Sequence, residues 1–262
     1  MLSDIQRRIL EVTARDRTLT NYVAGDVALN RRSQRIGRFI DVFCDETGLV
    51  RQTSRQDIAT LHKAGFTVRI TVEEAATVQV DVGRFRIETP IRWFEAKLER
   101  FFAAQRDADF GCRLHDVDLA VDKITSAAGH LDAGDLADLV GSVSAVGPLG
   151  PLIWAATAKT DHGPGRLIEE LRRRVDACPL EELVQIPLDS PMEARQAKDE
   201  LLAALGRAEV WARDEAPEVA PGQLFVDAKD RPVEATQAMI DAGDAAARAL
   251  VAEGAVPKAG GS

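Results

Sequence analysis

Two acidic side chains interrupt apolar, strand-like runs in the first half of the chain. Asp41 lies between Ile40 and Val42 in the run RFIDVFC, and Glu88 follows Ile87 in FRIE. A carboxylate in such a run is costly to bury unless it is paired, hydrogen-bonded or bound to a metal ion. Two acids on neighbouring strands can share a divalent cation, and magnesium held by carboxylates serves nucleotidyl or phosphoryl transfer. The pattern predicts Asp41 and Glu88 as a catalytic, magnesium-binding pair.

A glycine turn precedes the first of these strands. Residues 22–24 are short and apolar and read as a buried strand that ends at Gly25. A glycine at the start of a helix lets backbone N–H groups approach a phosphate closely. We expect Gly25 to permit this approach, whereas the carboxylate of Asp26 beside it would repel a phosphate.

These pieces resemble the nucleotidyltransferases of the AbiEii/AbiGii toxin type, within the minimal nucleotidyltransferase superfamily. Residues 24–26 take the place of the family's Gly-Gly or Gly-Ser turn. Residues 39–41 resemble its D-x-D strand, and residues 86–88 resemble the strand that carries its third acid. The resemblance covers roughly residues 20–160.

Further matches follow downstream in the family's order. Residues 100–102 read RFF and residues 114–120 read LHDVDLA, with Lys123 beyond them, as in a family segment RFF…LHxxDLAxxK. Asp135 and Asp138 fall where the family has an R-D-x-x-D pattern. The resemblance implies that Lys123 supports the negative charge of the phosphates.

The activity that the resemblance implies is Mg²⁺-dependent transfer of a nucleotide from a nucleoside triphosphate to a hydroxyl group on a nucleic acid or a protein. Asp41 and Glu88 would hold the metal, and Gly25 would admit the triphosphate. Two departures affect this site directly, because Asp26 replaces the second glycine and Phe39 replaces the first acid of D-x-D. We therefore expect weak or lost activity.

Two alternatives follow from these departures. Asp26 could supply the carboxylate missing at Phe39, so that a magnesium ion lies between Asp26, Asp41 and Glu88. The chain could instead be an inactive pseudoenzyme that binds a partner protein or a ligand through the old cleft. An apolar ring in a former metal site suits packing or binding better than catalysis.

The site residues also have ordinary structural explanations. Asp41 could pair with Arg38 or Arg86 as a half-exposed strand acid. Glu88 could simply end a strand near solvent. Lys123 could form ion pairs with acids one turn away on its own helix.

Hydrophobic periodicity indicates the elements that must position these residues. Helical spacing is predicted over 3–15 and 54–64, and strand-like alternation over 66–72 and 77–82, continuing at Phe85 and Ile87. From Pro90 the period lengthens, which predicts a helix that begins there and carries the following apolar residues. They are Trp93, Phe94 and Leu98.

The second half of the chain reads as mostly helical. We predict helices near 116–129, 132–145, 149–158, 165–177, 191–213 and 233–253, with a strand-like island at 223–226. The fold class is therefore α+β: a nucleotidyltransferase-like mixed sheet with flanking helices in 1–110, followed by a helical domain in 111–262.

Charge and cysteine content limit the partners and the compartment. The 262 residues carry a net charge of −9, which argues against strong general binding to nucleic acid. Two arginine clusters, at 31–38 and 172–174, read as solvated surface. The three cysteines are far apart and predict a reducing compartment, the cytoplasm. No apolar run approaches the ~18 residues of a membrane helix.

Overall fold

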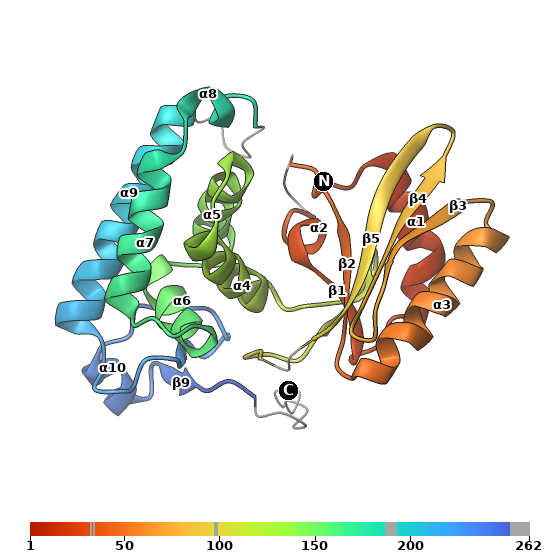
Figure 1. Ribbon diagram of the computed structural model, residues 1–262. Helices are drawn as coiled ribbons and strands as arrows, with labels where there is room; N and C mark the ends of the chain where they lie inside the picture. Colours follow the sequence, from red (N-terminus) through yellow and green to blue (C-terminus); the bar gives the residue numbers. More distant parts are fainter. Residues whose placement is uncertain (32, 34, 97–98, 187–192, 252–262) are drawn as a thin grey trace. The chain divides into compact units, whose positions relative to one another are not determined.

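The computed structural model describes residues 1–31, 33, 35–96, 99–186 and 193–251. Figure 1 shows the chain as two compact units, Met1–His115 and Asp116–Val251. The first unit contains a mixed sheet with flanking helices, and the second is mostly helical. The predicted α+β fold with a helical C-terminal region is confirmed.

A seven-stranded sheet forms the centre of the first unit, in the order β3-β4-β5-β2-β1-β7-β6. Its strands are β1 (Asn21–Ala24), β2 (Ile40–Cys44), β3 (Thr67–Glu73), β4 (Thr77–Arg84), β5 (Ile87–Glu95), β6 (Gln105–Asp107) and β7 (Gly111–Arg113). β5 runs parallel to β2 and β7 runs parallel to β1, whereas the other neighbours are antiparallel. Since β7 pairs with β1, the first unit extends past residue 110.

Helices α1 (Asp4–Thr13) and α3 (Thr47–Lys63) lie on the same side of this sheet (Figure 1). Trp93 of β5 points to this side and donates its Nε1 hydrogen to Asp57 of α3 at 2.8 Å. Asp57 also accepts two hydrogen bonds from the guanidinium of Arg17. Burial raises the pKa of Asp57, although Arg17 and Trp93 oppose that shift. Buried strand residues whose side chains point to the same side as Trp93 complete this core: Ile40, Val42, Cys44, Val78, Val80, Val82 and Ile91.

The opposite face of the sheet carries the polar residues of interest. Because side chains alternate along a strand, Asp41 and Phe43 of β2 point away from α3, together with Arg92 and Phe94 of β5. The short helix α2 (Gly25–Leu29) follows β1 directly. This face contains the candidate site.

The prediction of a helix that begins at Pro90 is wrong, because residues 87–95 form strand β5. Pro90 pairs with Asp81 of β4, and pairing with β2 begins only at Ile91. The missing N–H of proline therefore costs no bond to β2. Trp93 and Phe94, assigned to one helix, point to opposite faces of the sheet. Leu98 lies outside the described residues.

The second unit contains the predicted helices with shifted ends. They are α4 (Asp116–Gly129), α5 (Ala133–Ala145), α6 (Leu149–Ala156), α7 (Pro164–Ala177) and α9 (Ala194–Val210). A short helix that the periodicity does not predict, α8 (Leu180–Leu183), lies between α7 and α9 in the chain. The apolar stripe of α7 is buried as its helical spacing predicts. No single helix in the described ranges combines the length and apolarity needed to cross a membrane.

The prediction of one long last helix over 233–253 is also wrong. Only α10 (Gln237–Ala242) is helical, because Gly243 adopts a left-handed φ of 78° and ends it. β9 (Ala246–Arg248) follows and pairs with β8 (Leu224–Val226), and residues 252–253 lie outside the described ranges. These short elements surround an aromatic cluster built on Trp154, Trp211 and Phe225.

Candidate functional site

Gly25 and Asp41, which the sequence places in two separate motifs, lie against one another. Gly25 has a φ of 67°, and a Cβ atom placed on it would come 2.3 Å from Oδ2 of Asp41. Only glycine therefore fits this position, both for its backbone conformation and for the space available. Asp41 pairs with Ala24 across the β1–β2 ladder, which fixes this contact.

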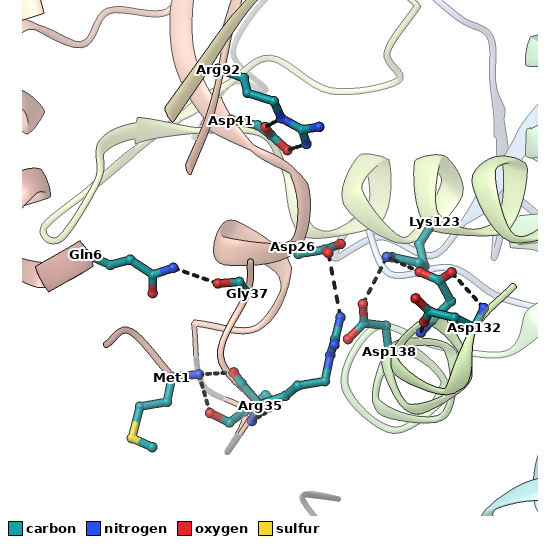
Figure 2. A network of polar contacts seen from close by, with 12 residues as sticks. Met1, Gln6, Asp26, Arg35, Gly37, Asp41, Arg92, Lys123, Asp132 and Asp138 are labelled. Atoms are coloured by element: carbon teal, nitrogen blue, oxygen red, sulfur yellow. Dashed lines mark hydrogen bonds and ion pairs between the residues drawn. The ribbon is translucent and has the colours of Figure 1, made fainter. Parts of the chain in front are cut away.

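Arg92 is the residue that sequence reasoning missed. It lies beside Asp41 in the parallel β2–β5 ladder. Nε of Arg92 donates to Oδ1 of Asp41 at 2.7 Å, and Nη2 donates to Oδ2 at 2.9 Å (Figure 2). This fork-like pairing of two charged groups is among the stronger hydrogen-bonded arrangements in proteins. The Asp41 side chain is 9% exposed and that of Arg92 is 28% exposed, so solvent reaches mainly the arginine.

Phe39 supports this guanidinium from the position where the resembled family has its first acid. The Cζ atom of Arg92 lies 3.7 Å from the centroid of the Phe39 ring, and that of Arg38 lies 5.1 Å from it. Such contacts are attractive through the ring quadrupole. The position therefore gathers two cations around an aromatic ring, where a metal site would need a carboxylate.

Glu88 lies on the same face of the sheet as Asp41 but at a different level. It is four residues before Arg92 on β5, about 13 Å along the strand at the usual rise per residue. Its side chain is 60% exposed, and its carboxylate lies 3.7 Å from Arg69. The fold does not bring Glu88 to Asp41. Glu88 instead lies near the end of a strand, close to solvent, which is the alternative to a role as a metal ligand.

Asp26 follows Gly25 at the start of α2, and its carboxylate lies 3.7 Å from the guanidinium of Arg35 (Figure 2). The loop that carries Arg35 is fixed by the first helix, because Gln6 donates to the carbonyl of Gly37 at 2.6 Å. A Cβ atom on Gly37 would come 2.6 Å from the backbone nitrogen of Val27. The loop therefore packs directly on the glycine turn.

The residues around Asp41 do not fit a magnesium ion. Magnesium needs oxygen ligands in near-octahedral order, but the strand neighbours of Asp41 are Ala24 and Arg92. The guanidinium occupies both carboxylate oxygens of Asp41. Within the described part of the chain, no three His, Cys, Asp or Glu side chains gather in a way that could hold a metal ion.

Lys123 belongs to the second unit, on α4, where it contacts two carboxylates of α5. Its Nζ lies 3.0 Å from Asp135 Oδ1 and 2.9 Å from Asp138 Oδ2 (Figure 2). The Lys123 side chain is 8% exposed and that of Asp138 is fully buried. Asp135 also completes a capping box with Asp132 at the start of α5. Three of the downstream residues of the family resemblance, Lys123, Asp135 and Asp138, thus form one ion cluster.

The contiguous arginines of α7 have structural partners. Arg172 pairs with Glu209, Arg173 pairs with Glu170, and Arg174 donates to the backbone carbonyl of Ala128. These contacts agree with a solvated helix face. Arg32, from the other predicted arginine cluster, lies outside the described residues.

Comparison with solved structures identifies the fold. The chain is similar to MenT4, a nucleotidyltransferase toxin from Mycobacterium tuberculosis H37Rv, with a TM-score of 0.51 and 12% identity over 79% of this chain and 85% of that one. The fold is nucleotidyltransferase-like. JHP933 from Helicobacter pylori overlaps with a TM-score of 0.48 and 14% identity, over 81% of this chain and 95% of that one. No protein-family model and no curated protein sequence matches the chain.

Proposed function

We propose that this chain is a nucleotidyltransferase-fold pseudoenzyme related to the AbiEii/AbiGii toxins. Its sheet-face site binds a phosphate-bearing ligand, such as a nucleoside triphosphate, and does not transfer a nucleotide. The observation that supports this proposal is the guanidinium of Arg92 on both oxygens of Asp41. A fixed organic cation stands where the resemblance implies a magnesium ion.

The chemistry of arginine suits such a ligand. A guanidinium stays charged at all physiological pH values and has five N–H donors, which match phosphate oxygens well. Asp41 engages Nε and Nη2 of Arg92, which leaves the donors on Nη1 for a ligand. Arg38 adds a second positive charge on the same ring of Phe39. Binding through these groups requires no divalent cation.

Calorimetry with nucleoside triphosphates tests the proposal. We expect binding to persist in EDTA and to weaken at least tenfold in Arg92→Ala, while Arg15→Ala, an exposed arginine of the same unit, binds like the native chain. Labelled triphosphates with Mg²⁺ and a range of acceptors should show no transfer. Transfer that Asp41→Ala abolishes without unfolding the chain would contradict the proposal.

A second candidate is surviving Mg²⁺-dependent transfer to a hydroxyl group. The buried cluster of Lys123 with Asp135 and Asp138 favours it, because the resemblance implies that this lysine supports phosphate charge. In this case Arg92 must leave Asp41 when substrate and metal bind. Arg92→Ala would then increase transfer, and Lys123→Ala would decrease it.

A partner protein is the alternative occupant of the sheet face. Phe39 and Phe94, which both lie near the Arg92 guanidinium, offer apolar contact area for it. Because a similar solved structure is that of a nucleotidyltransferase toxin, we propose a protein that inhibits this chain as the class of partner. The three cysteines are free, buried thiols, which supports our proposal of a reducing cytoplasm.

A further inference from the structure

The turn between β4 and β5 holds two residues, Phe85 and Arg86, in the left-handed backbone region. Their φ values are 52° and 67°, and the pair of Arg84 with Ile87 closes the hairpin on either side of them. Two-residue turns with both residues at positive φ strongly prefer Asn-Gly, because a Cβ atom crowds the backbone there. Strain of this kind concentrates at functional sites. A bulky aromatic residue is therefore an unusual choice for this position, and a functional role is one explanation for it.

The Phe85 ring is 86% exposed but is not isolated. The guanidinium of Arg84 lies over it, with Cζ 5.3 Å from the ring centroid. The same guanidinium lies over the ring of Phe66, also at 5.3 Å, and Phe66 is buried. The three side chains form a column that is anchored in the core at one end. An aromatic ring in contact with solvent forms the other end.

A hollow of about 390 Å³ adjoins this column, lined by Gly65, Thr67, Gly83 and residues 84–88. A Cβ atom on Gly83 would come 2.8 Å from Oγ1 of Thr67, so a larger residue at this position would crowd the lining of the hollow. Arg84 and Arg86 line it together with the acidic Glu88. Arg69, which lies beside Glu88, is paired with Asp81 at 2.6 Å, so the two lining arginines are the cations that can meet a ligand.

We infer that this hairpin tip binds single-stranded nucleic acid. A base stacks on Phe85, and the adjacent phosphates contact Arg84 and Arg86. Aromatic rings accept any base in this way, and arginine pairs well with phosphate. The unit that carries the tip has 19 Lys and Arg against 16 Asp and Glu, so its charge does not oppose a polyanion.

The affinity that one stacked base contributes decides whether the ligand is a nucleic-acid strand or a free nucleotide. One stacked base contributes roughly 10-fold to 100-fold in affinity, too little for an open site to retain a mononucleotide. A strand supplies several phosphates and bases at once. The tip exposes only Phe85 and Ile87 as large apolar side chains, beside the acidic Glu88, which disfavours insertion into a membrane. The inference does not depend on the phosphate site at Arg92.

Fluorescence anisotropy with labelled 12-nucleotide RNA and DNA strands of mixed sequence, in EDTA, tests the inference on the full chain. We expect Phe85→Ala to weaken binding about 10-fold or more, and Phe85→Trp to preserve it. Arg86→Ala should reduce the slope of log affinity against log salt by about 0.7. Arg15→Ala, with a side chain 74% exposed on the same unit, should bind like the native chain.

A double variant separates lost binding from damaged folding. Phe85→Asn with Arg86→Gly installs the preferred turn, so it should raise the thermal midpoint by several degrees while it weakens strand binding. Equal affinity of the native chain and Phe85→Ala for single strands would overturn the inference. It would also be overturned if the native chain bound duplexes as tightly as single strands. Phe85-dependent binding to anionic vesicles without binding to strands would overturn it too. Triphosphate binding that depends on Arg92 is unaffected by any of these results.

Discussion

The sheet unit and the helical unit differ in charge, and the Asp41–Arg92 pair of the sheet face differs from the Lys123 cluster of the helices in its contact with solvent. Residues 1–115 carry 19 Lys and Arg against 16 Asp and Glu, whereas residues 116–251 carry 13 against 25. On the sheet, one carboxylate meets an arginine that keeps further donors and contact with solvent. Among the helices, one lysine meets two carboxylates and is almost fully enclosed.

Two departures from the resembled motifs lie in the sheet unit. Asp26 and Phe39 change the sheet unit at the phosphate and metal positions, and Arg92 fills the space beside Asp41. In the helical unit, Lys123 and Asp138 match the resembled motif and lie together.

The largest expected effect comes from breaking the helical cluster. Lys123→Met leaves the buried carboxylate of Asp138 without this cation, and removing one partner of a buried pair costs about 3–5 kcal/mol. Urea unfolding measures the loss. The matched control is Arg213→Ala, which breaks an exposed pair with Asp214 and should change stability by less than about 0.5 kcal/mol. A loss below about 1 kcal/mol for Lys123→Met would contradict the contrast between the Lys123 cluster and the Asp41–Arg92 pair.

The sheet site should respond to a single methyl group. Gly25→Ala places a Cβ atom where Asp41 Oδ2 lies and imposes a left-handed conformation on alanine. We expect a loss of about 2–3 kcal/mol in urea unfolding and a parallel loss of triphosphate binding. Gly48→Ala is the control, since nothing lies within 4 Å of its Cβ position. Full triphosphate affinity in Gly25→Ala would show that binding does not use the Asp41–Arg92 pair.

The smallest effect concerns acid pH and the helical unit. The side chain and backbone of Arg231 lower the pKa of Asp227 from 3.8 to about 2. A lowered pKa in the folded state stabilises the fold above the ordinary pKa, and this contribution is lost as pH falls from about 4 toward 2. The difference in thermal midpoint between the native chain and Asp227→Asn should shrink over that range. A constant difference would contradict the shift.

Local patterns in the sequence predicted much of this fold. β1, β2 and the buried stripe of α7 each follow from the spacing of apolar residues in one short segment. β5 was missed because Pro90 suggested the first turn of a helix, and that error hid Arg92. Alternation along residues 87–95 would have placed Arg92 on one face of a strand.

The candidate site depends on pairing between distant segments, which one sequence does not reveal. Asp41 and Arg92 are 51 residues apart and meet only because β2 and β5 pair in one particular register. Glu88 has the same alternation but lies beyond the start of that pairing. Lys123 meets Asp138 through the packing of α4 on α5, which likewise joins separate elements.

Binding of Mn²⁺, followed by the electron paramagnetic resonance signal of the free ion, tests most directly whether Arg92 has replaced the metal. Mn²⁺ prefers the same oxygen ligands as magnesium. We expect the native chain to leave the signal of the free ion unchanged, and Phe39→Asp combined with Arg92→Ser to bind one ion at micromolar to millimolar concentration. One ion retained by the native chain and released by Asp41→Ala would contradict the replacement.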